Sequence, residues 1–209
     1  MSWKLSAFVV LALIAGIATA RFVQDPHTGT ATWDAARAAG FAAYLLLWAS
    51  TVLGIAVHMR FRPGGAPLTQ VLELHRISGT LALSFLVAHV FALVVDPVVP
   101  SSLLSGFVPF TSTYRPLQVG LGTLSEWLLV VVLASTALAG SMRYATWRAV
   151  HLLAFPCYLF ALAHGITSGT DTGSTQSVLL YAASAATVAA MGVVRIVGRG
   201  WADAAELQP

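Results

Sequence analysis

The chain has 209 residues, of which 57% are hydrophobic and only 9% charged, so its composition excludes an ordinary soluble domain. Its formal net charge of +3 comes from eleven Lys and Arg residues against eight acids, too few and too dispersed for a nucleic-acid-binding surface. The single cysteine, Cys157, excludes a disulfide or a cysteine-based metal centre within one chain. We therefore expect an all-α integral membrane protein in which any metal is bound by histidine.

Six segments are long and apolar enough to cross a bilayer core, which requires about 20 helical residues. They comprise residues 5–22, 39–58, 74–95, 118–141, 147–167 and 177–196. The longest connection, residues 97–117, carries four prolines that interrupt any continuous helix. The spans leave almost no room for a soluble domain, so the sequence predicts a single domain over residues 1–209, built as a six-transmembrane-helix bundle.

The first segment admits a second interpretation. Lys4, a moderate apolar stretch and the small residues Ala18, Thr19 and Ala20 also resemble a secretory signal with its cleavage site. Cleavage would leave five spans and place the new N-terminus outside. We therefore expect an uncleaved first helix.

The distribution of basic residues predicts the orientation, because short cytoplasmic loops retain an excess of Lys and Arg. A cytoplasmic N-terminus gives eight basic residues inside and three outside. The inner set is Lys4, Arg60, Arg62, Arg76, Arg143, Arg148, Arg195 and Arg199, and the outer set is Arg21, Arg37 and Arg115. We expect a multi-pass plasma-membrane protein, surrounded by membrane lipid, with both termini in the cytoplasm.

Four of the six histidines lie within expected spans, where polar side chains are costly and usually functional. A step of fourteen positions separates His75 from His89 on the third span, and a step of thirteen separates His151 from His164 on the fifth. These steps correspond to about 21 and 19.5 Å of helix. Because both spans are odd-numbered, they run in the same direction. His75 and His151 then share the inner depth, while His89 and His164 share the outer depth.

Two imidazoles at one depth can ligate one haem iron, so the pattern indicates two stacked sites. A lone histidine in a span could instead simply hydrogen-bond a neighbouring helix. At about 100° per residue, a step of fourteen returns to within about 40° of its starting face, but a step of thirteen ends about 140° away. His164 is therefore the weakest ligand by periodicity. Pro156, between the two histidines, could kink or rewind the fifth helix.

The segments LELHRISGTLALSFLVAHV and WRAVHLLAFPCYLFALAHG, with a weaker contribution from GFAAYLLLWASTVLGI, resemble the ferric reductase-like transmembrane domain family. That family includes ferric reductases, NADPH oxidases and the haem subunit of a bacterial periplasmic methionine sulfoxide reductase. The resemblance implies two b-type haems stacked between the third and fifth of six helices. Carried over to this sequence, its ligands are His75 and His151 for the inner iron and His89 and His164 for the outer iron.

The larger members of that family carry flavin and nicotinamide domains, whereas only a tail of about ten residues follows the last span here, and no dinucleotide or phosphate-loop motif is present. We therefore expect no flavin or nicotinamide site in this chain. The resemblance implies a haem subunit of a multi-component reductase, which takes electrons from a separate flavoprotein or from quinol. The acceptor would be extracytoplasmic: ferric iron, oxygen or a redox protein.

Several residues near the histidines have two interpretations each. Arg76 and Arg148, one and three residues from the inner ligands, are either partners of haem propionates or simple cytoplasmic anchors. Glu126 is the only acid well within a span, and it either hydrogen-bonds a ligand or relays a proton, or else reaches water from a helix end. We expect Trp127 and Trp147 to be packing or interfacial aromatics.

Two other functions stay open. One is a single-haem cytochrome linked to quinone, in which one histidine pair serves another purpose. The other is a proton-coupled transporter that uses the histidines and Glu126 as a relay and holds no haem.

Overall fold

The computed structural model describes residues 31–96 and 102–206, and over these residues the chain is helical without any strand. The first expected span, residues 5–22, and the signal-peptide alternative lie outside the described residues. In chain order the elements are α2 (Ala31–His58), η1 (Pro63–Gly65), α3 (Leu68–Val95), α4 (Leu103–Phe107), α5 (Pro116–Ala137), η2 (Ala139–Ser141), α6 (Tyr144–His151), α7 (Ala154–Ser168) and α8 (Thr175–Glu206).

Five stretches of the described residues are long and apolar enough to cross a membrane: α2, α3, α5, the run Tyr144–Ser168 that joins α6 to α7, and Thr175–Val197 of α8. Each coincides with one of the last five expected spans, although the boundaries differ. The largest difference is in α2, which begins at Ala31 and not at residue 39. Arg37, expected in a loop, therefore lies within a helix.

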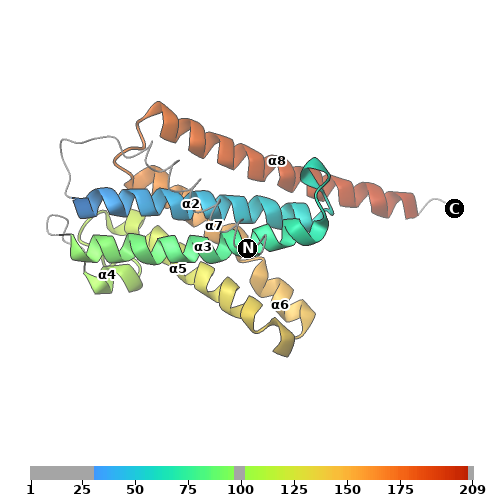
Figure 1. Cartoon of the computed structure of the whole chain (residues 1–209), viewed down its shortest axis with the longest axis horizontal. Helices are drawn as coiled ribbons and strands as arrows, with labels where there is room; N and C mark the ends of the chain where they lie inside the picture. The colour runs from blue at the N-terminus through green and yellow to red at the C-terminus, as the bar shows by residue number, and fades with distance from the viewer. Residues whose placement is uncertain (1–30, 97–101, 207–209) are drawn as a thin grey trace, which may run out of the picture.

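The spans are arranged as two antiparallel helix pairs. In the first hairpin, α2 packs closely along α3; in the second hairpin, α5 packs along α6 and α7. Contacts between the two hairpins are far fewer, and α8 packs mainly on α2. Figure 1 shows the long α2 and α3 side by side, with α5 diverging from them toward α6. The short α4 lies at the end of the bundle where α3 ends.

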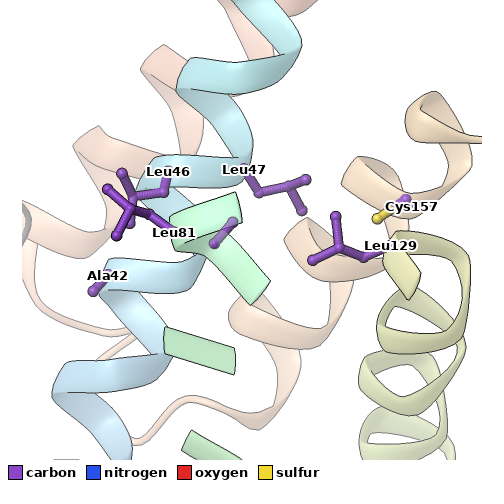
Figure 2. Packing of buried hydrophobic residues seen from close by; sticks show 7 residues of the cluster. Ala42, Leu46, Leu47, Leu81, Leu129 and Cys157 are labelled. Atoms are coloured by element: carbon purple, nitrogen blue, oxygen red, sulfur yellow. The ribbon is translucent and has the colours of Figure 1, made fainter. Parts of the chain in front are cut away.

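A buried apolar cluster joins the hairpins at mid-depth. Figure 2 shows Leu47 of α2 directed toward Leu129 of α5, which lies beside Cys157 of α7. The complete cluster is Ala42, Leu46, Leu47, Leu81, Ala82, Leu129 and Cys157. Since lipid tails are as apolar as these side chains, this contact stabilises the bundle through close packing and not through removal of apolar surface from water.

A polar network attaches α8 to the bundle. The hydroxyl of Tyr158 on α7 donates to Ser184 Oγ on α8 at 3.2 Å, and Tyr44 on α2 also hydrogen-bonds Ser184. The Tyr44 and Tyr181 rings meet edge to face with centroids 5.3 Å apart. Buried hydroxyls need such partners within a bilayer, so the network fixes the position of α8.

The fifth expected span is broken between α6 and α7, at Leu152 and Leu153. Pro156 lies one turn later, and in a continuous α-helix its ring would clash with the carbonyl of Leu152. At the break, Leu153 N donates to Val150 O and Phe155 N donates to Leu152 O, both in the tighter i to i−3 pattern. Such turns advance about 120° per residue instead of 100°. The local overwinding acts in the direction that brings His164 back toward the face of His151.

Candidate functional site

The four membrane histidines meet in two pairs between α3 and the run from α6 to α7. The ring centroids of His75 and His151 are 5.9 Å apart, with planes crossed at 70°. Those of His89 and His164 are 6.4 Å apart, with planes crossed at 77°. Each pair joins one imidazole from each hairpin, at one of two depths.

Three of the imidazoles are oriented by a backbone carbonyl. Nδ1 of His75 donates to the carbonyl oxygen of Ser50 at 2.8 Å, Nδ1 of His89 to that of Ala36 at 2.7 Å, and Nδ1 of His164 to that of Gln118 at 2.9 Å. A carbonyl can only accept, so the hydrogen of the neutral ring is on Nδ1. Nε2 then keeps its lone pair, which is the state that a metal ligand requires.

His151 has a different environment. Its Nδ1 lies 3.4 Å from Thr136 Oγ1, a longer contact than the other three. The Trp147 ring stacks on His151 with centroids 5.1 Å apart and planes inclined at 28°. Among the described residues, Nε1 of Trp147 is one of the few buried polar side-chain atoms without a hydrogen-bond partner. The inner pair is thus adjacent to an unused buried donor.

Glycines make room for the same three imidazoles. A Cβ on Gly40 would lie 2.9 Å from Nδ1 of His89, and one on Gly122 would lie 2.8 Å from Nδ1 of His164. A Cβ on Gly54 would lie 3.1 Å from Cε1 of His75. Each of these rings therefore rests directly on the backbone of the neighbouring helix.

A cavity of about 220 Å³ opens around the outer pair, and most of its lining is apolar. Its polar lining includes Glu126 of α5 and Arg37 of α2. Nε of Arg37 donates to Asp171 Oδ2 at 2.7 Å, and a second guanidinium nitrogen bonds the other Asp171 oxygen. Nη1 of Arg37 donates to Asp34 Oδ1 at 3.1 Å. The Arg37 and Asp171 side chains are only 10% and 15% exposed. A nearly buried ion pair in the lining of this cavity therefore ties α2 to the segment between α7 and α8.

The other residues singled out in the sequence are less closely engaged. The Arg76 side chain is 61% exposed and lies 3.9 Å from Glu73 Oε2. Nη1 of Arg148 donates to the Tyr144 hydroxyl at 3.4 Å. Trp127 Nε1 donates to the carbonyl of Phe107 at 2.8 Å and so ties α5 to α4. These contacts of Arg76 and Arg148 are made with residues other than the histidines, whereas Trp147 stacks on His151.

The separation of the rings in each pair fits the binding of one metal ion between two imidazoles. Two imidazoles that bind one metal through nitrogens at about 2 Å have ring centres about 6 Å apart, close to both observed separations. Within the described residues, no group of three or more His, Cys, Asp or Glu side chains could hold a bare metal ion. An iron whose remaining ligands come from a porphyrin would need only two nitrogens from the protein, which each histidine pair could supply. The unpaired N–H of Trp147 would also suit an acidic edge of that group. The residues present therefore fit haem.

Sequence reasoning missed the glycines and the carbonyls that orient the rings. One signal was available: Gly40 and Gly54 are separated by a step of fourteen, the same step as His75 and His89 on the antiparallel partner helix. It was missed because glycines in membrane helices commonly serve helix packing alone.

A family model described as ferric reductase like transmembrane component matches residues 38–162. The matched range includes His75, His89 and His151 and ends two residues before His164. Comparisons with curated proteins and with solved structures found no significant match. Ferric reductase-like domains generally bind haem, in agreement with the donor set of the two pairs. Because the match covers more than half of the chain, this multi-pass membrane protein belongs to the ferric reductase-like transmembrane family and is a membrane redox component.

Proposed function

We propose that this protein is a membrane b-type cytochrome that carries electrons across the bilayer through two bis-histidine haems. His75 and His151 would hold the inner iron, and His89 and His164 the outer iron. The observation that carries the proposal is the pair of crossed imidazole contacts, with ring centroids 5.9 and 6.4 Å apart. Such matched pairs would be a coincidence in a transporter relay.

The protein's contribution is to hold, orient and dehydrate the two sites, while bound haem supplies one-electron chemistry. Hydrogen bonds to backbone carbonyls fix the rings of His75, His89 and His164 before any ligand arrives. The apolar cluster around Leu47 and Leu129 lies between the two depths, where its side chains would disfavour the entry of water. This preorganisation suits electron transfer, because little needs to move when the charge changes.

Residues near the cytoplasmic face are the proposed partners of the haem propionates at the inner site. Arg76 and Arg148 supply positive charge close to His75 and His151, and Trp147 offers its unused indole N–H. We further propose that the protein acts as the haem subunit of a multi-component reductase. A separate flavoprotein or quinol would be the donor, and an extracytoplasmic compound or protein the acceptor.

The direct test is the haem content of the full chain purified in detergent. We expect about two haems per chain, with the reduced-minus-oxidised spectrum of a b-type cytochrome. They should be removable without bond cleavage, since no Cys-x-x-Cys-His motif is present for covalent attachment. A ratio near one would favour the single-haem, quinone-linked cytochrome. Full function without haem would favour the transporter.

Histidine variants then test which rings share an iron. His75→Ala and His151→Ala should remove the same haem, and His89→Ala and His164→Ala the other. The two classes are distinguishable by redox titration and by the electron paramagnetic resonance of the haem that remains. His164→Ala is the most informative variant, because His164 lies outside the residues matched by the family model. Retention of both haems in that variant, with loss of one in His89→Ala, would refute the outer ligand assignment.

A further inference from the structure

The three carbonyls that orient histidines share one position relative to the glycines beneath the rings. Ala36 precedes Gly40 by four residues, Ser50 precedes Gly54 by four, and Gln118 precedes Gly122 by four. In an α-helix, the carbonyl of residue i−4 accepts the N–H of residue i, but its oxygen has a second lone pair. Without a Cβ on residue i, an imidazole can approach close enough to use that lone pair. We call this arrangement of a glycine and the carbonyl four residues earlier a socket.

The fourth position departs from this pattern at Thr136. Thr136 follows Gly122 by a step of fourteen on α5, as Gly54 follows Gly40 on α2. Its hydroxyl donates to Val132 O, four residues earlier, at 2.9 Å. Ser135 Oγ also donates to Val132 O, at 2.8 Å, so hydroxyls occupy the carbonyl oxygen that an imidazole uses in the other three sockets. Nδ1 of His151 meets Thr136 Oγ1 at 3.4 Å instead.

The consequence concerns the electron density on the ligating nitrogen. A strong hydrogen bond from Nδ1 to a carbonyl raises the basicity of Nε2, which stabilises the oxidised iron and lowers its potential. The outer pair has two such bonds, at 2.7 and 2.9 Å. The inner pair has one, at 2.8 Å, together with the long contact to the hydroxyl.

We propose that Thr136 sets a difference in reduction potential between the two haems, by weakening the hydrogen bond to His151 and so raising the potential of the inner site. This inference rests on the proposed two-haem function and adds to it a residue that tunes one site. Thr136 is a positioning residue, which acts through His151 and not by touching the iron.

Two variants should move one potential in opposite directions. Because Ser135 Oγ also donates to Val132 O, at 2.8 Å, the carbonyl becomes free only when both hydroxyls are removed. The double variant Ser135→Ala/Thr136→Gly builds the fourth socket, so the potential of the His75–His151 haem should fall, whereas Ser135→Ala alone leaves Thr136 on the carbonyl and should not lower it. Thr136→Val keeps the volume but removes the hydroxyl, so Nδ1 of His151 loses its acceptor and that potential should rise. Thr136→Ser keeps a hydroxyl and should stay near wild type.

The measurement is a spectroscopic redox titration of the full chain with both haems bound, accompanied by electron paramagnetic resonance of the oxidised protein. The matched controls are Thr187→Gly and Thr187→Val on α8, because Thr187 makes the same bond to its i−4 carbonyl, Ala183 O at 2.7 Å, on an exposed face. Neither control should shift either potential.

The outcomes separate the two proposals. A wild-type protein without two haems contradicts the proposed function itself. A protein with two haems, in which both Ser135→Ala/Thr136→Gly and Thr136→Val leave the potentials unchanged or shift both haems together, contradicts only the role of Thr136. Loss of a haem in Thr136→Ser as well would assign the residue a packing role and also overturn the proposal.

Discussion

Glycines determine how closely the helices of each hairpin approach the imidazoles. At Gly40, Gly54 and Gly122 the missing side chain permits a ring to lie on the helix backbone, and the same opening exposes the carbonyl that orients the ring. Ligand orientation and helix packing therefore depend on the same atoms. Substitution of any of these glycines by alanine should therefore disturb both the orientation of the ligand and the packing of the helices.

Alanine substitution at these glycines should reduce the haem content in proportion to the steric overlap between the added Cβ and the imidazole. Gly40→Ala and Gly122→Ala would place a Cβ 2.9 and 2.8 Å from a ring nitrogen, so each should lose most of the outer haem, about half of the total content. Gly54→Ala, with its closest atom at 3.1 Å, should retain more of the inner haem. The helices themselves should not weaken, because alanine is favoured over glycine by about 0.5–1 kcal/mol in a helix interior.

The haem-to-protein ratio of each purified variant measures this effect. Gly192→Ala on α8 is the matched control, since nothing lies within 4 Å of its added Cβ. If the control lost as much haem as Gly122→Ala, the effect would belong to glycine substitution in general. The socket would then have no special role.

Among the elements, the broken run from α6 to α7 has the clearest cause. Pro156 is the third residue of α7, a first-turn position where the missing N–H removes no bond within that helix. Its ring is incompatible with a continuous helix through Leu152, so the break falls at Leu152 and Leu153. The break lies between His151 and His164 and turns the chain in the direction that offsets part of the angular mismatch of a thirteen-residue step.

Pro156→Ala should remove the obstacle to a continuous helix. On an ideal helix His164 would then point about 140° away from the face of His151. We expect lower occupancy of the outer haem, with far-ultraviolet circular dichroism showing unchanged or slightly higher helix content. Pro116→Ala provides the control, because Pro116 is the first residue of α5 and should be nearly neutral there. Full retention of both haems in Pro156→Ala would show that other contacts, and not the proline, maintain the break.

How far the sequence predicts these elements depends on how local each signal is. The histidine spacings and the apolar spans are properties of single helices, and the spans that fall on described residues appear where they were expected. The start of α2 differs from the expected one because hydropathy cannot foresee that Arg37 pairs with Asp171, 134 residues away. The socket carbonyls could not be predicted from the sequence either, since a hydrogen bond to Ser50 O depends on how α2 and α3 pack.

For the whole molecule, the order of the candidate spans predicts which segments lie on the same side of the membrane. Between the end of α3 and the end of Thr175–Val197, the described chain has three candidate spans: α5, the run Tyr144–Ser168 and Thr175–Val197 itself. If each of them crosses once, we expect the end of α3 and the end of Thr175–Val197 to lie on opposite faces of the membrane. The excess of basic residues predicts that the C-terminus is cytoplasmic.

Topology reporters that are active on only one side of the membrane test this arrangement. Fused after Asp96, a reporter of external location should be active; fused at the C-terminus, it should be silent, and a cytoplasmic reporter should give the reverse pattern. Equal signals from both positions would contradict the number of crossings. Exchanged signals would keep the crossings and reverse the predicted orientation.

The division into two hairpins also bears on how the protein is made. Each hairpin is a closely packed helix pair, and only limited contacts, such as the mid-depth cluster, join the two. If each iron is bound by one imidazole from each hairpin, as proposed, the haems themselves become the strongest links between the halves. Membrane insertion would then come first and closure of the bundle second, with cofactor supply setting the pace of maturation. A cell short of haem would accumulate a looser precursor, exposed to membrane proteases until its cofactors arrive.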